Sequence, residues 1–83
     1  MTFRAKILIF LKEGVLDTQG KTVAKSLQQL GYASLRNARV GKYIQLWIDA
    51  DSREEARKQA DSMCDDLLVN DLIEDYSIQL EEE

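Results

Sequence analysis

The sequence contains no histidine and only one cysteine among its 83 residues. Without histidine, the commonest general base and the commonest metal ligand of proteins are both missing. The single cysteine, Cys64, can form neither an internal disulfide nor a multi-cysteine metal site, which suits a reducing compartment. We therefore expect a cytoplasmic chain without a catalytic histidine or a cysteine-based metal centre.

An excess of basic charge and a long hydrophobic run are also missing. The formal net charge is −4 and the isoelectric point is about 4.8, whereas binding to nucleic acid or to an anionic membrane depends on clustered lysine and arginine. The apolar run at residues 7–11 is too short to span a membrane, and no small-residue cleavage site follows it. We expect no nucleic acid, no membrane and no signal peptide.

What is present is the composition of one small folded domain, residues 1–83. Hydrophobic residues make up 45% of the chain and charged residues 31%, far from the composition of disordered proteins. A domain of this length buries only about 60% of the surface that its unfolded chain exposes. Its own core therefore gives marginal stability, and a partner is expected to help.

The hydrophobic pattern predicts an α+β fold. Period-2 alternation predicts strands, and helical spacing predicts helices. The predicted strands are residues 3–11, 32–40 (weak), 43–49 and 73–80, and the predicted helices are residues 17–30 and 52–70. The order β-α-β-β-α-β is typical of a split βαβ domain, in which two helices cover one face of a four-stranded antiparallel sheet.

Local signals fix the ends of these elements. Asp17 and the Ser52-x-x-Glu55 capping box are predicted to start the two helices, and Gly31 is predicted to end the first. The Gly41-Lys42 pair predicts a tight turn into the third strand.

The stretch EGVLDTQGKT, residues 13–22, ends in the last letters of a phosphate-binding loop. Such a loop needs four residues between its glycines, so that backbone N–H groups can wrap the phosphates. Here five residues separate Gly14 from Gly20, and Asp17 would lie inside the anion cradle. The stretch therefore predicts a loop and a helix start, and we expect Gly20 to let a neighbouring subunit approach closely.

The cysteine and the acidic residues near the second helix could suggest a nucleophile or a cation site, but both are better explained as parts of the fold. Cys64 lies beside Asp65 and Asp66, whose charges raise a thiol pKa and disfavour a nucleophile. The acidic residues around positions 49–55 lack the glycine and the alternating ligands of a calcium loop. We interpret them as cap residues and a solvated helix face, and we predict no catalytic, cofactor-binding or metal-binding residue on this chain.

The face of the predicted sheet opposite the helices carries large apolar residues, although no predicted element covers it. Leu8 and Phe10 of the first strand and Tyr43 and Trp47 of the third are predicted to lie there, and such apolar patches mark interaction sites. An RNA-binding sheet also displays aromatic residues, but it needs a positive surround and a specific motif that this chain lacks. We interpret the four residues as a self-association surface, against the alternative that they are ordinary exposed hydrophobic residues.

Four segments resemble one family along nearly the whole chain. They are VLDTQGKTV (residues 15–23), LGY (30–32), ARVGKYIQL (38–46) and LLVNDLIEDYSI (67–78). Each is similar to the corresponding segment of the PurS subunit of phosphoribosylformylglycinamidine synthase, also called formylglycinamide ribonucleotide amidotransferase. Thr18 and Asp71 stand where that family usually has proline, which removes local stiffness.

The resemblance implies a non-catalytic subunit of a ligase of de novo purine (IMP) biosynthesis. In that family the large synthetase subunit, PurL, uses ATP and magnesium to activate the formamide oxygen of formylglycinamide ribonucleotide. The glutaminase subunit, PurQ, releases ammonia from glutamine. PurS joins the two, supports ammonia transfer, and associates as a homodimer or homotetramer.

The loops of the chain complete the sequence-based interpretation. Leu16, Asp17, Gly20, Gly41 and Lys42 lie in two loop regions that we expect to face the larger subunits. A small-molecule-sensing dimeric regulatory module is the alternative, because ligand-binding domains with the same element order dimerise and bind amino acids between subunits.

Overall fold

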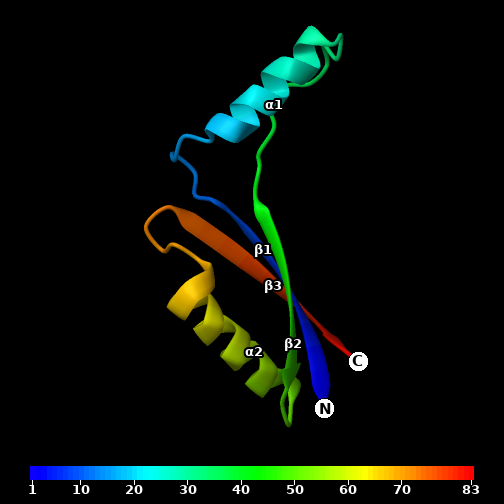
Figure 1. Cartoon of the computed structure of the whole chain (residues 1–83), viewed down its shortest axis with the longest axis vertical. Coiled ribbons are helices and arrows are strands. Elements are labelled where there is room, and N and C mark those ends of the chain that lie inside the picture. Colours follow the sequence, from blue (N-terminus) through cyan, green and yellow to red (C-terminus); the bar gives the residue numbers. More distant parts are fainter.

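A computed structural model describes residues 1–83 and shows one three-stranded sheet with two α-helices (Figure 1). Strand β1 lies in the middle and pairs antiparallel with β2 on one side and β3 on the other. The elements in chain order are β1 (Thr2–Leu11), α1 (Thr18–Gln29), β2 (Lys42–Asp49), α2 (Arg53–Met63), the π-helical turn η1 (Cys64–Leu68) and β3 (Glu74–Glu82). The predicted α+β class is confirmed.

The fourth strand predicted at residues 32–40 is wrong. This segment leaves the sheet region, and two of its backbone N–H groups bond to side chains instead of to a neighbouring strand. The N–H of Ala38 donates to Asn37 Oδ1 and that of Val40 donates to Asp17 Oδ2, both at 2.9 Å. Asparagine and, to a lesser degree, alanine are depleted in strands, so the local hydrogen bonds prevail.

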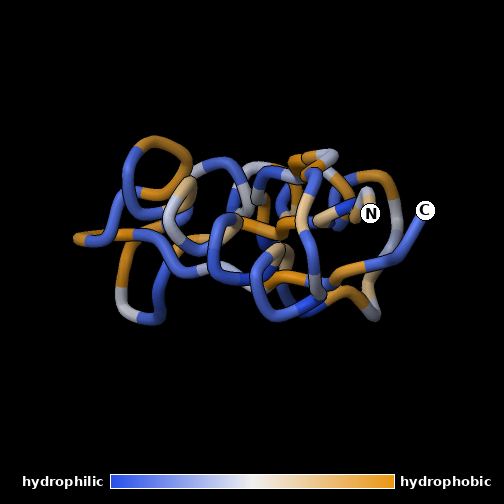
Figure 2. The backbone as a smooth tube through the Cα atoms, turned by 90° about the horizontal axis from the view of Figure 1, so that it is seen from below, coloured by the Kyte–Doolittle hydropathy of each residue, from blue (hydrophilic) through white to orange (hydrophobic).

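The core lies between the sheet and α2. Phe3, Ala5, Ile7 and Ile9 alternate along β1 and are buried, while the residues between them face the other way. Figure 2 colours the backbone by hydropathy and shows short hydrophobic and hydrophilic stretches following one another along the chain. Fully buried alanines at positions 56 and 60 let α2 approach the sheet closely.

Helix α2 begins as predicted but ends earlier. Ser52 Oγ accepts a hydrogen bond from the N–H of Glu55 at 3.1 Å, which caps the first turn. The α-helix stops at Met63 and continues as η1, whose wider turn ends where the N–H of Val69 donates to the carbonyl of Cys64. The chain thereby keeps both Cys64 and Val69 in the core.

Helix α1 has the predicted bounds but not the predicted position. Asp17 is its N-cap and Gly31 follows its C-terminal end with φ of 109°. The helix packs against neither the sheet nor α2 and extends beyond the sheet at one end of the molecule (Figure 1). Only α2 covers the sheet, so the prediction of two helices on one face is wrong for a single chain.

Gly41 and Lys42 form no tight turn. Lys42 is the first residue of β2 and pairs with Ile9. A Cβ atom on Gly41 would lie 2.5 Å from the carbonyl oxygen of Ile9, so glycine is needed where the incoming chain crosses the end of β1.

None of the helices is long and apolar enough to cross a bilayer.

Candidate functional site

The face of the sheet opposite α2 is uncovered, and we call it the open face. It carries the alternate residues of all three strands that do not point to the core. Leu8 is paired with Tyr43 across the β1–β2 ladder, and Trp47 is paired with Arg4. Leu8, Tyr43 and Trp47 are 51%, 53% and 58% exposed. The structure thus places the predicted interaction residues on one accessible face.

Phe10 is the least exposed of the predicted residues on this face. It is only partly buried, and the guanidinium carbon of Arg39 lies 5.4 Å from the centre of its ring. Arg39 also donates to the carbonyl oxygen of Leu11. A cation over an aromatic face is favourable, so Phe10 helps to fix the segment that carries α1.

The open face also contains an ion cluster that the sequence-based interpretation missed. Arg4 and Lys6 of β1 both pair with Glu81 of β3. The Nε atom of Arg4 lies 3.6 Å from Glu83 Oε1, and Trp47 Nε1 donates to the same oxygen at 3.1 Å. The sequence does indicate the basic half of this cluster, because the period-2 alternation of β1 places Arg4 and Lys6 on the same face as Leu8.

Hydrogen bonds from Lys6 and then Arg4 lower the pKa of Glu81 to about 2. The hydrogen bond to Glu81 in turn raises the pKa of Arg4. The cluster keeps both signs of charge beside the exposed aromatic residues, as is common at the rim of an interface.

The ion cluster should make stability depend on pH. Because the pKa of Glu81 falls from 4.5 to about 2 on folding, its contribution is present above pH 4.5 and is lost as the pH falls toward about 2. We expect Glu81→Gln to lower the urea midpoint near neutral pH, and the difference from the natural chain to shrink through this acidic range. Glu82→Gln, on an exposed residue of the same strand, is the control, and an E81Q difference that stayed constant with pH would contradict the assignment.

Residues 15–40, which we call the α1 lobe, are held together by Asp17. Its carboxylate accepts the N–H of Gly20 at 2.8 Å and the N–H of Val40 at 2.9 Å. These two hydrogen bonds lower the pKa of Asp17. Farther along, Gln28 Nε2 donates to the carbonyl of Leu35 at 2.9 Å. The lobe is therefore a helix tied to the segment that returns from it.

The structure corrects the expectation for Gly20. This residue is buried, and a Cβ atom on it would lie 2.4 Å from the carbonyl oxygen of Ala38. The close approach that glycine permits is therefore made by this chain itself and not by a neighbouring subunit. Asp17 is likewise engaged within the lobe, whereas Leu16 is 61% exposed.

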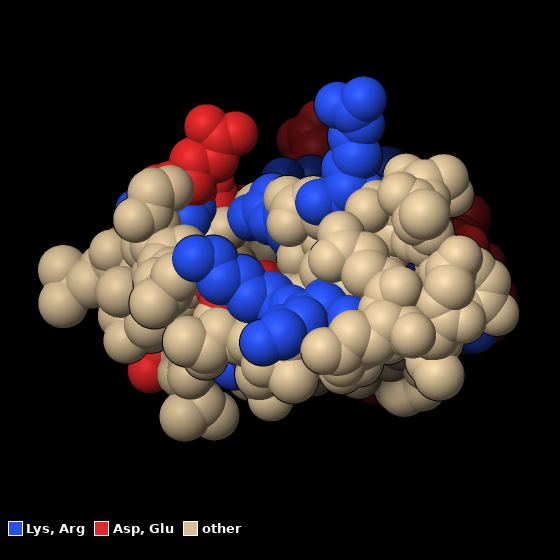
Figure 3. All heavy atoms as spheres, turned by 90° about the horizontal axis from the view of Figure 1, so that it is seen from above, with Lys and Arg blue, Asp and Glu red and all other residues tan.

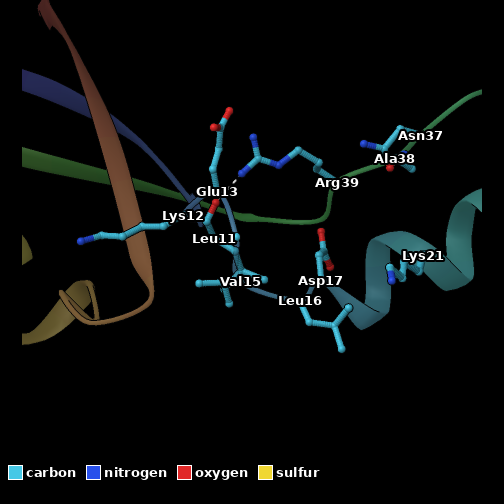
Figure 4. A pocket seen from close by; sticks show the side chains of 11 residues that line it. Leu11, Lys12, Glu13, Val15, Leu16, Asp17, Lys21, Asn37, Ala38 and Arg39 are labelled. Atoms are coloured by element: carbon cyan, nitrogen blue, oxygen red, sulfur yellow. Dashed lines mark hydrogen bonds between the residues drawn. The ribbon is translucent and has the colours of Figure 1, made fainter.

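A shallow hollow of about 580 Å³ lies where the α1 lobe joins the sheet (Figure 4). Arg39 reaches across it toward Leu11 and Glu13, while Lys12 points away. Both signs of charge line it, and no three His, Cys, Asp or Glu side chains of the chain form a group that could hold a metal ion. Its lining residues are Leu11, Lys12, Glu13, Gly14, Val15, Leu16, Asp17, Lys21, Asn37, Ala38 and Arg39.

Charge is distributed unevenly between two segments of the chain. Between positions 12 and 40 there are five basic and two acidic residues, whereas between positions 50 and 83 there are three basic and twelve acidic residues. Several Lys and Arg side chains gather on the end of the molecule formed by α1 (Figure 3). The α1 lobe is thus a basic end on an acidic protein.

The remaining reactive groups are held in structural roles. Cys64 is a buried free thiol, and burial is the main cause that raises its pKa, with Asp61 and Asp65 adding to it. Tyr76 donates to Asp61 Oδ1 at 3.1 Å, and burial together with this hydrogen bond raises the pKa of Tyr76 to about 12. Neither group is poised for nucleophilic or acid–base chemistry near neutral pH.

Comparison with known proteins gives one consistent result. The sequence model of a family described as "PurS: Phosphoribosylformylglycinamidine (FGAM) synthase" matches residues 4–82. The chain is 40% identical over 79 residues to the phosphoribosylformylglycinamidine synthase subunit PurS of Synechocystis sp., covering 95% of this chain and 79% of that protein. It is 38% identical over 80 residues to the subunit of the same name from Bacillus subtilis, covering 96% and 94%.

Solved structures are similar over the same length. A crystal structure of PurS from Methanocaldococcus jannaschii, 32% identical, superposes with a TM-score of 0.89 over 98% of both chains. A chain in the structure of PurLQS from Thermotoga maritima, 27% identical, superposes with a TM-score of 0.91 over 98% of this chain and 99% of that one. The similarity therefore extends over the sheet, α2 and the projecting α1 lobe alike.

Proposed function

The chain belongs to the PurS family of subunits of phosphoribosylformylglycinamidine synthase, and from this premise we propose that it is the small adaptor of that ligase. It acts in purine biosynthesis as part of a complex, with no catalytic residue of its own. The family match over residues 4–82 carries the proposal. The relative in a PurLQS structure supports the synthetase PurL and the glutaminase PurQ as partners.

An adaptor contributes to catalysis by positioning. Ammonia released from glutamine is protonated and diluted in bulk water, so docking the glutaminase on the synthetase raises its effective concentration at the acceptor. ATP and magnesium belong to the synthetase in this scheme, and this chain supplies surfaces only. We infer a cytoplasmic location from its single, free cysteine.

The open face is the proposed self-association surface, formed by Leu8, Phe10, Tyr43 and Trp47. Large exposed aromatic residues are characteristic of interface centres, and the ion cluster beside Trp47 supplies a polar rim. A homodimer or homotetramer built on this face leaves the two loop regions accessible to the larger subunits.

The proposed partner-facing residues are of two kinds. Some can contact PurL or PurQ directly, and the others hold the shape of the loops. Leu16 is exposed, and the side chain of Lys42 is 60% exposed beside Glu74 at 3.5 Å, so both can touch PurL or PurQ. Asp17, Gly20 and Gly41 shape the same loops through contacts within the chain and act on the partners indirectly.

Reconstitution tests the adaptor function. With PurL and PurQ present, leaving out this chain should abolish glutamine-dependent amidination of formylglycinamide ribonucleotide, because ammonia no longer reaches the acceptor efficiently. Ammonia-dependent synthesis should be largely retained, because the synthetase site is intact. Undiminished glutamine-dependent activity without the chain would refute the proposal.

Trp47→Asp tests the open face. A charge at the centre of an apolar contact costs about 2 kcal/mol or more, so we expect the variant to dissociate in light scattering at concentrations where the natural chain is oligomeric. Ser62→Asp, which adds the same charge on an exposed residue of α2, should not change the molar mass. A W47D chain that kept its full molar mass would exclude Trp47 from the interface.

A further inference from the structure

The α1 lobe is joined to the sheet at a narrow junction, formed by residues 12–14 after β1 and by Gly41 before β2. Helix α1 contacts no strand and no part of α2, and no backbone hydrogen bond joins residues 15–40 to a strand. The hollow of about 580 Å³ lies at this junction, so the lobe and the sheet are not packed tightly against each other there. The orientation of the lobe therefore depends on few contacts.

The outgoing side of the junction is built around Gly14. The N–H of Lys12 donates to the carbonyl of Ile73 at 2.9 Å, which fixes the chain to the sheet up to Lys12. Gly14 follows with φ of 86°, and no other part of the chain lies within 4 Å of the place where its Cβ atom would be. Asp17 already belongs to the lobe, because it accepts the N–H of Val40. The change of direction thus occurs in a turn that nothing surrounds.

Arg39 is the side chain that crosses the junction. Its Nη2 atom donates to the carbonyl oxygen of Leu11, the last residue of β1, and this is the only hydrogen bond between the lobe and a strand. Its guanidinium carbon lies 5.4 Å from the centre of the Phe10 ring, where a cation is attracted to the ring face. Figure 4 shows Arg39 reaching across the hollow toward Leu11. Because the guanidinium is planar and makes both contacts at once, it fixes a direction as well as a distance.

The lobe keeps its own shape by other bonds. The Asp17 carboxylate accepts two backbone N–H groups, and Gln28 Nε2 donates to the carbonyl of Leu35. Arg39 takes part in none of these bonds. The cohesion of the lobe and its orientation on the sheet therefore have separate causes.

We propose that Arg39 is a positioning residue that sets the orientation of the α1 lobe relative to the sheet. Its effect on activity rests on the proposed adaptor function, because the two loop regions expected to face PurL and PurQ lie on opposite sides of the junction. Leu16 belongs to the lobe, whereas Lys42 is the first residue of β2. Two surfaces of one adaptor engage their partners together only when their mutual geometry allows it, and Arg39 maintains that geometry.

Distances between two spin labels test the orientation. Labels are attached at Gln29→Cys on α1 and Lys58→Cys on α2, both exposed, while the natural Cys64 is buried and stays unlabelled. An excess of unlabelled chain ensures that only distances within one chain are measured by double electron–electron resonance. In Arg39→Ala the ratio of molecules outside the natural distance range to those inside it should rise about tenfold, because a charged hydrogen bond and a ring contact are both lost.

Arg36→Ala is the matched control, since it removes the same atoms from an exposed arginine of the same returning segment. It should leave the distances as they are in the natural chain. Hydrogen exchange of the α1 amides should be unchanged in both variants. Distances in R39A equal to those in R36A would overturn the proposal, and so would a loss of α1 protection in R39A, because Arg39 would then act in folding the lobe.

Reconstitution with PurL and PurQ gives the readout in activity. R39A should lower glutamine-dependent synthesis several-fold relative to R36A, while ammonia-dependent synthesis stays near that of the natural chain. If leaving out the chain abolishes glutamine-dependent synthesis but R39A supports it fully, the role of Arg39 in activity is refuted and the adaptor function stands. If leaving out the chain changes nothing, the adaptor function itself is refuted, and the label distances alone decide whether Arg39 orients the lobe.

Discussion

Ile7→Ala is expected to destabilise the folded chain by about 2–5 kcal/mol, because it removes a fully buried side chain and leaves a cavity. Ile7 is 0% exposed and belongs to the core cluster with Ile9, Cys64 and Val69. A domain of this length has a total stability of roughly 4–12 kcal/mol, so the loss is a large share of it. Urea unfolding at a fixed protein concentration measures the effect.

Leu8→Ala is the matched control. Leu8 follows Ile7 in the same strand but is 51% exposed on the open face, so its truncation should change the stability of the single chain by less than about 0.5 kcal/mol. Any larger loss should depend on protein concentration, because it reflects weakened self-association. Equal, concentration-independent losses for the two variants would show that the assignment of the two faces is wrong.

Gly20→Ala is the second change with a large expected effect. Replacing glycine by alanine inside a helix normally stabilises it by about 1 kcal/mol. Here the added methyl group would lie 2.4 Å from the carbonyl oxygen of Ala38 and 2.5 Å from Asp17 Oδ2, so we expect destabilisation by about 1–3 kcal/mol. The sign of the effect is therefore diagnostic.

Ser26→Ala on the exposed side of α1 provides the comparison. Thermal or urea unfolding measures both variants. Ser26→Ala should be neutral or slightly stabilising, whereas Gly20→Ala should lower the unfolding midpoint. Hydrogen exchange should place the G20A effect in residues 15–40, because the clash joins α1 to its returning segment. A G20A chain as stable as the natural one would mean that this segment moves away at no cost.

Local features of the fold were predictable because each depends on neighbours in the sequence. Alternation along residues 3–11 identified β1 and its buried face, and the caps Asp17 and Ser52 identified the starts of both helices. The weak pattern at residues 32–40 gave a false strand. Strand formation requires a neighbouring strand, and Asp17 instead binds the N–H of Val40.

The candidate site was predictable only as far as it depends on the alternation of residues along single strands. Period-2 patterning placed Leu8, Tyr43 and Trp47 on the face away from the core, and the structure shows them exposed. The same patterning contained Arg4 and Lys6, but only the pairing of β1 with β3 brings Glu81 to them. Gly20 was recognised as a point of close approach, yet its neighbour was identified only by the path of the chain at Ala38.

The sequence by itself determined the strands β1, β2 and β3, the caps of α1 and α2, the aromatic residues of the open face and the family of the chain. These depend on residue type and spacing, which are local properties. Only the tertiary structure decided that the sheet has three strands and that α1 stands apart from it. Periodicity establishes which side chains share a face, but the path of the backbone in space establishes whether anything in the same chain reaches that face to cover it.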